Sequence, residues 1–296
     1  MRLSAAAALN NDGSHPEEEG IDAGGATVPV PLHGHQVEIE TWRAVADLEY
    51  LAAEDLAFRL KMPFEVRKRT ARIRLDAPAT AAERAAMQRN LDYHHRDATL
   101  EGARDFELTA ATWWRGVFAE ADRLEFSSGL TLPIGETESN PYARDASGNV
   151  VPHEHVQFGT GTFDPIVQVT WARRFGERWA GNLYGAARLP FYENRHDFRA
   201  PCEFTLASGA SRAIGEHWHA RATLTTIYSG FAEWDDTRDP NSGWLVHYAG
   251  LGAEWRGETI TASLLVQFPF GQQILGPGDE TFDLGPVISL SLLLPL

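Results

Sequence analysis

The strongest constraint on the fold is the segment Thr259–Phe268, in which apolar and polar residues alternate. In a β-strand, successive side chains point to opposite faces, so Ile260 and Leu264 share one face, and Thr261 and Ser263 share the other. A strand of roughly 9–11 residues with this pattern is long enough to cross a bilayer within a barrel. Its apolar face then meets lipid and its polar face meets the lumen. The segment therefore predicts a transmembrane β-strand.

Composition agrees with a β-barrel in a membrane. The mean hydropathy is -0.30, and no run of about 18 apolar residues is present, which excludes transmembrane helices but not barrel strands. The single cysteine, Cys202, excludes an intrachain disulfide and a paired-cysteine metal site. The net charge of -15 argues against nucleic acid as a partner. After Met1, the apolar run Ala5–Leu9 is too short for the core of a secretory signal, so we expect a mature form from which a signal peptide has been removed.

Eleven segments of the chain show the alternation, and they follow one another as hairpins. They are Trp42–Tyr50, Leu56–Met62, Phe106–Trp114, Leu124–Leu132, Phe163–Trp171, Trp179–Leu189, Cys202–Ile214, His217–Tyr228, Trp244–Trp255, Thr259–Phe268 and Leu284–Leu292. Short links alternate with long ones, which is typical of bacterial barrels, with their periplasmic turns, extracellular loops and even strand number. The even number requires one more strand, and Arg2–Leu9 is the candidate; the alternative is that this segment is a remnant of a signal peptide.

These observations predict an all-β protein, a closed antiparallel transmembrane β-barrel of about twelve strands (ten to fourteen) in the bacterial outer membrane. We expect a single domain over residues 1–296, with both termini on the periplasmic side. The expected outer loops are about 10–36, 70–103, 135–161, 192–201, 229–243 and 271–282, and a short surface helix is expected at Pro78–Leu91. The alternative fold, a soluble β-sandwich, would leave lipid-facing rows such as Ile260–Phe268 exposed to water.

Charged residues of both signs fall on the polar faces of the predicted strands. They are Arg43, Asp47, Glu49, Arg59, Lys61, Glu107, Arg115, Glu125, Asp164, Arg188, Glu203, Arg221 and Glu254. Buried charges need partners, so in a narrow barrel we expect these residues to line the lumen and to form ion pairs across it. The alternative is a ladder of charges that selects one permeant.

Most of the histidines fall in or beside the expected outer loops. They are His15, His33, His35, His94, His95, His153, His155 and His196. Imidazole binds zinc, copper and related ions, but a complete site needs ligands from several loops. We consider His94, His95, His153 and His155 as candidate metal ligands, with Asp97 and Glu154 to orient the rings, and affinity falling between about pH 7 and 5 as imidazole protonates. The alternative is a solvated acidic loop with incidental histidines.

No group of residues indicates catalysis. A serine–histidine pair could be assembled from Ser127, Ser128, His219 or His247, but His219 is expected to face the lumen and His247 the lipid, so no such pair is evident. We therefore expect that the protein is not an enzyme.

Two glycine-rich segments form a paired motif. The first is Gly129–Thr137, with Leu-Pro-Ile-Gly at its centre, and the second is Gln157–Pro165, with Gly-Thr-Gly-Thr-Phe-Asp-Pro. The pair resembles the outer-membrane putative transporter family named for the meta-cleavage pathway of phenol degradation. There a strand ending in Leu-Pro-x-Gly leads through a loop into a Gly-x-Gly-x-x-Asp-Pro strand start, and His94–Asp105 resembles that family's entry into the preceding hairpin. The resemblance covers about residues 100–295. It implies a β-barrel channel without cofactor or catalytic residues, and its implied substrates are aromatic or other hydrophobic small molecules.

The sequence thus favours passive passage of a small, hydrophobic or aromatic molecule through an outer-membrane channel. The expected partners are outer-membrane lipid, lipopolysaccharide and the permeant, with no nucleic acid. The alternative is a non-conducting barrel that holds a surface or periplasmic protein partner, or binds a divalent metal through its outer-loop residues.

Overall fold

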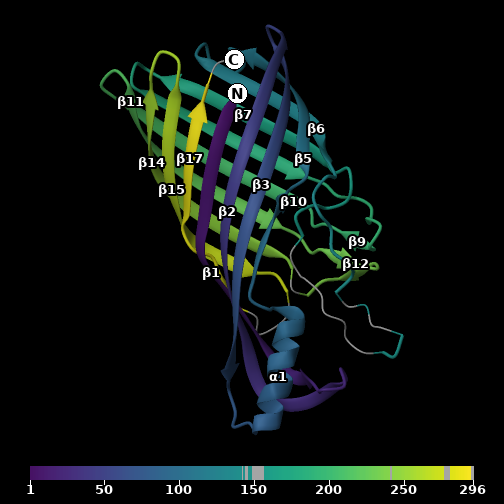
Figure 1. Ribbon diagram of the computed structural model, residues 1–296. Coiled ribbons are helices and arrows are strands. Elements are labelled where there is room, and N and C mark those ends of the chain that lie inside the picture. Colours follow the sequence, from purple (N-terminus) through teal and green to yellow (C-terminus); the bar gives the residue numbers. More distant parts are fainter. Residues whose placement is uncertain (142, 144–145, 149–156, 241, 277–280, 295–296) are drawn as a thin grey trace.

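Twelve long strands close into an antiparallel barrel in the computed structural model (Figure 1). The structure describes residues 1–141, 143, 146–148, 157–240, 242–276 and 281–294. In order around the barrel the strands are β1 (Arg2–Ile21), β17 (Val287–Leu293), β15 (Thr261–Ile274), β14 (Trp244–Arg256), β11 (Trp218–Ser229), β10 (Glu203–Ile214), β8 (Trp179–Arg188), β7 (Pro165–Phe175), β6 (Asp122–Leu132), β5 (Phe106–Arg115), β3 (Leu56–Leu75) and β2 (Thr27–Ala53). Pairing of β1 with β2 closes the barrel. The predicted fold class and strand number are confirmed.

Five short strands and one helix lie outside this ring. They are α1 (Ala81–His94), β4 (Ala98–Ala103), β9 (Phe198–Arg199), β12 (Glu233–Trp234), β13 (Thr237–Arg238) and β16 (Thr281–Asp283). Strands β13, β12 and β9 form a separate small sheet, whose core is Phe198, Ala200, Ala232 and Trp234. Within the described part of the chain, no helix has the length and apolar character needed to span a membrane.

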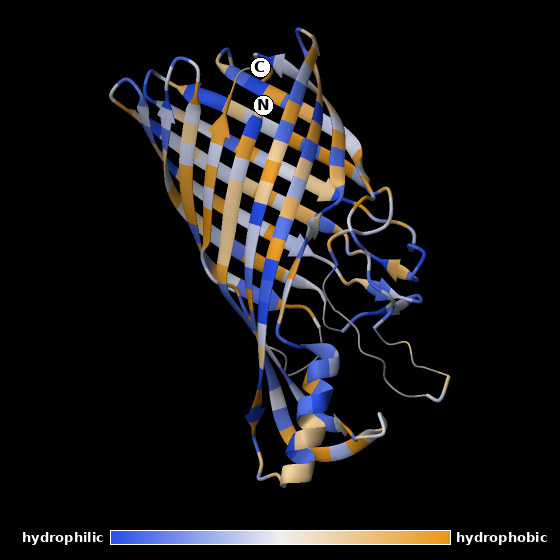
Figure 2. Ribbon diagram, in the orientation of Figure 1, coloured by the Kyte–Doolittle hydropathy of each residue, from blue (hydrophilic) through white to orange (hydrophobic). Residues whose placement is uncertain are grey.

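The barrel strands carry the predicted alternation on their two faces. Figure 2 shows hydrophobic and hydrophilic residues alternating along them. Outward-facing leucines remain accessible, with Leu224 54% and Leu251 73% exposed, because the outer surface faces lipid. Their neighbours along the chain, such as Thr225, turn inward to the lumen.

Both chain termini lie at the short-turn end of the barrel, opposite α1 (Figure 1). The Met1 amino group donates a hydrogen bond to the Leu294 carbonyl (2.8 Å), so the two ends lie side by side. The predicted placement of the termini on one side, at the short turns, is confirmed.

The first strand is much longer than predicted. Residues Arg2–Ala8 pair with β17 and with β2, which confirms the predicted barrel strand at Arg2–Leu9. The prediction of a loop over 10–36 is wrong, because β1 and β2 continue as a paired hairpin and turn only at 22–26. Asp22 fixes this turn, since its Oδ1 accepts hydrogen bonds from the backbone of Gly24 (2.7 Å) and Ala26 (2.9 Å). This hairpin lies beyond the barrel, so it needs no row of lipid-facing residues and the membrane alternation is absent from its sequence.

Strand β3 also extends beyond the barrel, and α1 packs on the extended strands (Figure 1). We call residues 12–38 and 70–95 the stalk. Its small core is Val30, Ala86 and Met87, with Val28 and Ile73 packed against them. The second outer loop, predicted at 70–103, is therefore largely structured by β3, α1 and β4.

The predicted helix at Pro78–Leu91 is shifted toward the C-terminus. It begins at Ala81 with Thr80 as its N-cap, because Thr80 and Glu83 form a capping box. Glu83 accepts from the Thr80 backbone N–H (2.6 Å), and the Thr80 hydroxyl accepts from the Glu83 backbone N–H (3.2 Å). Pro78 therefore precedes the helix instead of occupying its first turn.

An arginine on the outer face of the barrel should destabilise it more than one on the inner face. We predict that Leu224→Arg, near the middle of β11, lowers the free energy of unfolding in lipid vesicles by about 2–4 kcal/mol, because it buries a charge in hydrocarbon. Denaturant titration measures the change. The control is Thr225→Arg, which adds the same side chain one residue on, toward the lumen. Equal effects of both variants would contradict the assigned orientation.

Candidate functional site

A cavity of about 510 Å³ spans the barrel mouth at the stalk end. Its lining comes from opposite sides of the barrel, from β2 and β3 on one side to β14 and β15 on the other. The apolar lining is Val37, Ile39, Phe158, Phe198, Ala200, Ala232, Trp234, Trp244, Ile274 and Phe282. The charged lining is Arg67, Arg69, Arg104, Arg188, Glu203 and Asp239. A volume of this size with a mostly apolar wall and a few polar groups is typical of small-molecule sites.

The first residues of the segment 157–164, residues 157–160, form part of the wall of this cavity, and Asp105 holds the segment in place. One oxygen of Asp105 accepts a hydrogen bond from the Gly135 backbone (3.0 Å). The other accepts from the backbone (2.7 Å) and the hydroxyl (2.9 Å) of Thr160. One carboxylate therefore ties two segments of the chain to the start of β5. Beside it, the Phe158 ring contacts Gly102 and lies 5.4 Å from the Arg67 guanidinium.

The glycines of the paired motif allow two backbones to touch. A Cβ on Gly135 would lie 2.6 Å from the Gly159 backbone, and one on Gly159 would lie 2.5 Å from the Gly135 carbonyl oxygen. Gly161 has φ +72°, a conformation that favours glycine, and it packs against Asn194. The motif is thus explained by close packing at the mouth.

Asp164, predicted to line the lumen, is fully buried within the same packing. Its Oδ1 accepts a hydrogen bond from the Thr162 hydroxyl (2.5 Å), and its backbone N–H donates to the Thr131 hydroxyl (2.8 Å). Its second oxygen, Oδ2, has no hydrogen-bond partner among the described residues. Asp164 therefore anchors the start of β7.

Glu65, which the sequence analysis did not select, is the centre of a charge cluster below the cavity. It is 0% exposed, and it pairs with Arg43, with Arg67 (2.7 Å) and with Arg104 (3.0 Å). The inward row of β3, which includes Arg59 and Lys61, continues to Glu65 and Arg67 at the same two-residue spacing. Extending that alternation beyond Met62 would have identified the cluster.

Most of the remaining predicted lumen charges form ion pairs along the barrel wall. Arg59 pairs with Glu49 (2.6 Å) and Glu125 (2.5 Å), and Lys61 pairs with Glu107 (2.9 Å). The other two pairs are Arg188–Glu203 (2.9 Å) and Arg221–Glu254 (3.2 Å). All but Arg59–Glu125 join neighbouring strands, so the expected pairing across the lumen is not found among the described residues. Arg115 lies exposed at the end of β5.

The inward residues on the other side of the barrel are mostly small and neutral. They include Ala207, Gly209, Thr223, Thr225, Gly250, Gly252, Ser263, Ser289 and Ser291, on β10, β11, β14, β15 and β17. The long ion-paired side chains lie mainly on β2, β3, β5 and β6. The two walls of the lumen therefore differ in bulk and charge.

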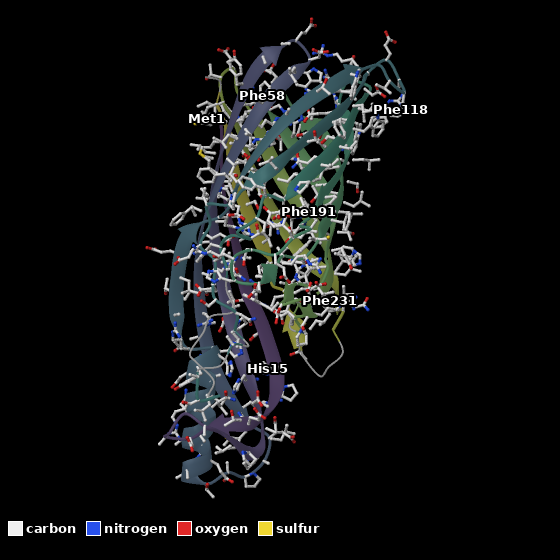
Figure 3. All side chains as sticks on the ribbon, turned by 90° about the vertical axis from the view of Figure 1, so that its right-hand side faces the viewer. Met1, His15, Phe58, Phe118, Phe191 and Phe231 are labelled. Carbon is white, nitrogen blue, oxygen red and sulfur yellow. The ribbon has the colours of Figure 1, made fainter. Side chains whose placement is uncertain are left out.

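Five histidines gather in the stalk, where β1, β2 and the end of α1 meet. His15 lies directly opposite His35 in the β1–β2 register, and their ring centroids are 5.0 Å apart. His95, the C-cap of α1, lies with its Nε2 3.1 Å from the Nε2 of His15. His33 and His94 adjoin this group, with ring centroids 5.1 Å from His35 and 6.2 Å from His95. Figure 3 shows His15 far along the long axis from Met1, Phe58 and Phe118, beyond the barrel.

The structure thus places two of the four predicted metal ligands, His94 and His95, beside other histidines. The other two, His153 and His155, lie outside the described residues, as does Glu154. Asp97 accepts a hydrogen bond from the Ala71 backbone (2.8 Å). His15 and His35 could have been paired from the sequence only if the β1–β2 hairpin had been predicted in place of a loop.

The His35 ring is neutral at physiological pH. Burial, followed by the neighbouring His15, His33 and His94, lowers the pKa of His35 to about 3. A neutral imidazole keeps a lone pair on one ring nitrogen, which is the form that binds metal ions.

The fold is similar to that of solved outer-membrane channels. An outer-membrane channel from Pseudomonas putida F1 is 14% identical, with 98% of this chain and 93% of that chain covered, at a TM-score of 0.54. The monoaromatic hydrocarbon channel CymD is 9% identical over 100% of this chain and 88% of that one, at a TM-score of 0.47. A FadL homologue from Pseudomonas aeruginosa is 13% identical over 98% and 89%, at 0.43. No protein-family description matches the sequence, and no curated protein matches it.

At these identities the first structure shows the fold alone: a β-barrel of the bacterial outer membrane. Of the residues considered for a serine–histidine pair, Ser127 is buried on β6, and His247 on β14 hydrogen-bonds the Thr226 hydroxyl (2.9 Å).

A methyl group at Gly135 should loosen the wall of the cavity. We predict that Gly135→Ala lowers the free energy of unfolding by about 1–3 kcal/mol, because the added Cβ overlaps the Gly159 backbone. Denaturant titration in detergent measures this change. Gly185→Ala is the matched control, since a Cβ there meets nothing within 4 Å and its backbone needs no positive φ. An unchanged stability for Gly135→Ala would show that segment 157–164 is not held as described.

Proposed function

We propose that the protein is an outer-membrane channel for the passive passage of a small hydrophobic or aromatic molecule. The observation that carries this proposal is the apolar cavity of about 510 Å³ that spans the barrel mouth. Aromatic side chains from separate elements, Phe158, Trp234 and Trp244 among them, converge on it. Flat apolar molecules gain most from such a lining, because aromatic rings pack well against one another.

The lumen beneath the cavity supports passage. Small neutral residues on β10, β11, β14, β15 and β17 line much of one side of the barrel, and the charged pair there, Arg221 and Glu254, joins neighbouring strands. On the other side, charges such as Arg59 and Glu125 are held against the wall by their ion pairs. A molecule that leaves the cavity therefore has a path along the neutral wall.

The arginines of the cavity refine the substrate class. Arg67, Arg104 and Arg188 contribute to its lining, beside the aromatic residues. A guanidinium favours a carboxylate and also stacks on aromatic rings. We therefore propose an aromatic or hydrophobic molecule that carries an acidic group as the preferred permeant.

The finer family assignment is also a proposal. The segments Gly129–Thr137 and Gln157–Pro165 support membership of the putative transporter family of the meta-cleavage phenol-degradation type, since they form one packed unit at the mouth. Outer-membrane lipid and lipopolysaccharide are the proposed surroundings of the outward apolar rows.

The second candidate function is a non-conducting barrel that binds a partner at the cell surface. The stalk favours it, because a β-hairpin and a helix that project beyond the barrel present a separate surface (Figure 1). Conductance distinguishes the two functions, since a scaffold barrel requires no open path.

Narrowing the neutral wall should reduce conductance. We predict that wild-type protein in planar bilayers conducts ions, and that Ser289→Trp lowers its single-channel conductance severalfold, because the indole enters the lumen. Ile288→Trp is the matched control: it adds the same ring one residue earlier, on the outer face, where Ile288 is 37% exposed. We expect no change for it. A wild-type protein that does not conduct, and vesicles that take up no aromatic acid, would support the scaffold function instead.

A further inference from the structure

We propose that His15, His35 and His95 bind a divalent ion of borderline softness, with Zn²⁺ as the reference ion, where the stalk meets the cavity. The three residues come from β1, from β2 and from the end of α1. Each offers one ring nitrogen, and these three atoms all lie within 4.8 Å of one another. The proposal concerns the stalk and does not depend on whether the barrel conducts.

The geometry is close to that of a metal site. In a tetrahedral zinc centre with Zn–N distances of about 2.0–2.1 Å, ligand nitrogens lie about 3.3 Å apart. The Nε2 atoms of His15 and His95 are 3.1 Å apart, which is within a few tenths of an ångström of that value. The three nitrogens lie within 4.8 Å of one another, so the third has to move closer by up to about 1.5 Å, which a side-chain rotation supplies.

The His35 ring gives an independent reason for a ligand. It is 0% exposed, and neither of its ring nitrogens has a hydrogen-bond partner among the described residues. A buried imidazole N–H and its lone pair are costly to leave without partners. Coordination of one nitrogen would give the ring the partner that the surrounding protein does not provide.

A neighbouring carbonyl orients one proposed ligand, His15, in the way that metal sites require, and another orients the adjacent His33. The Nδ1 of His33 lies 3.1 Å from the Pro31 carbonyl, and the Nδ1 of His15 lies 3.4 Å from the Pro16 carbonyl. When Nδ1–H donates to a carbonyl, Nε2 is left with the lone pair. Metal-ligating histidines almost always donate their second nitrogen in this way. For His15, the nitrogen that keeps the lone pair is then Nε2, which is hydrogen-bonded to the Nε2 of His95 and would exchange that hydrogen bond for the metal ion.

The ligand set and its access define the class of ion. Imidazole suits zinc, copper and nickel, whereas calcium and magnesium require oxygen ligands. His15 and His95 also line the cavity at the barrel mouth, so an ion can enter from there and a water molecule can take the fourth position. His33, whose Nε2 is buried without a partner among the described residues, is the nearest additional imidazole.

The test uses the full chain without a polyhistidine tag, in detergent and stripped with a chelator. Calorimetric titration with Zn²⁺ should give one site per chain, and Co²⁺ should give the visible bands of a tetrahedral nitrogen site. We expect His15→Ala and His95→Ala each to weaken Zn²⁺ binding by more than about 100-fold. Removal of a residue that only hydrogen-bonds a ligand typically lowers metal affinity by about 10–100-fold, so a larger loss indicates a direct ligand. Excess Mg²⁺ should not compete.

Two variants keep the test decisive. His196→Ala is the matched control: His196 is a half-buried histidine that accepts a hydrogen bond from Arg195 on the same side of the barrel, and this variant should bind as wild type does. The double variant His153→Ala/His155→Ala should also bind normally. Unchanged binding by His15→Ala, absence of binding by the wild type, or loss of binding only in the double variant would overturn the proposal. Far-ultraviolet circular dichroism and heat-modifiable gel migration verify that each variant is folded.

Discussion

The closure of the barrel by its first strand is the constraint on which the rest of the structure depends. In hydrocarbon, a strand edge with unpaired N–H and C=O groups is not tolerated, so the ladder has to return to its start. Residues Arg2–Ala8 complete it by pairing with β17 and β2. This segment carries mostly alanine, and one residue of its outward row, Ala7, lies opposite Ile288 and Trp42 and is only 8% exposed. Backbone pairing, more than apolar bulk, therefore determines the position of β1.

The stalk follows from the same ladder. The pairing of β1, β2 and β3 does not stop at the rim of the barrel. It continues into the stalk, which lies in water, with local bulges in β1 and β2. There the sheet needs cover on one face only, which α1 supplies through Ala86 and Met87. This arrangement brings His15 and His35 together across a hairpin and sets His95 over them at the end of the helix. The histidine group is thus a consequence of how far the strands extend.

The structural features that the membrane imposes could be predicted from the sequence, whereas features that it does not impose were missed. The alternation in segments such as Thr259–Phe268 predicted the barrel and its termini, because lipid and lumen demand opposite side chains on every strand. Residues 10–36 carry no such alternation, so a paired hairpin appeared as a loop. Asp105, whose carboxylate holds segment 157–164, gave no sequence pattern of its own, since its partners lie about thirty and fifty-five residues away. Glu65 was missed because the inward row of β3 was ended at Met62.

The distribution of charge inside the barrel follows from where each side chain finds a partner. Arginine and glutamate on adjacent strands pair within the wall, as Lys61 and Glu107 do, and this keeps both side chains near the sheet. Pairing across the lumen would instead extend two long side chains into the path and cost more conformational entropy. A barrel whose charges are compensated along its wall can therefore carry many ionised groups and still leave a neutral strip beside them. At the mouth, where Glu65 is outnumbered by arginines, the balance changes to positive, and this is where the proposed permeant would first meet the protein.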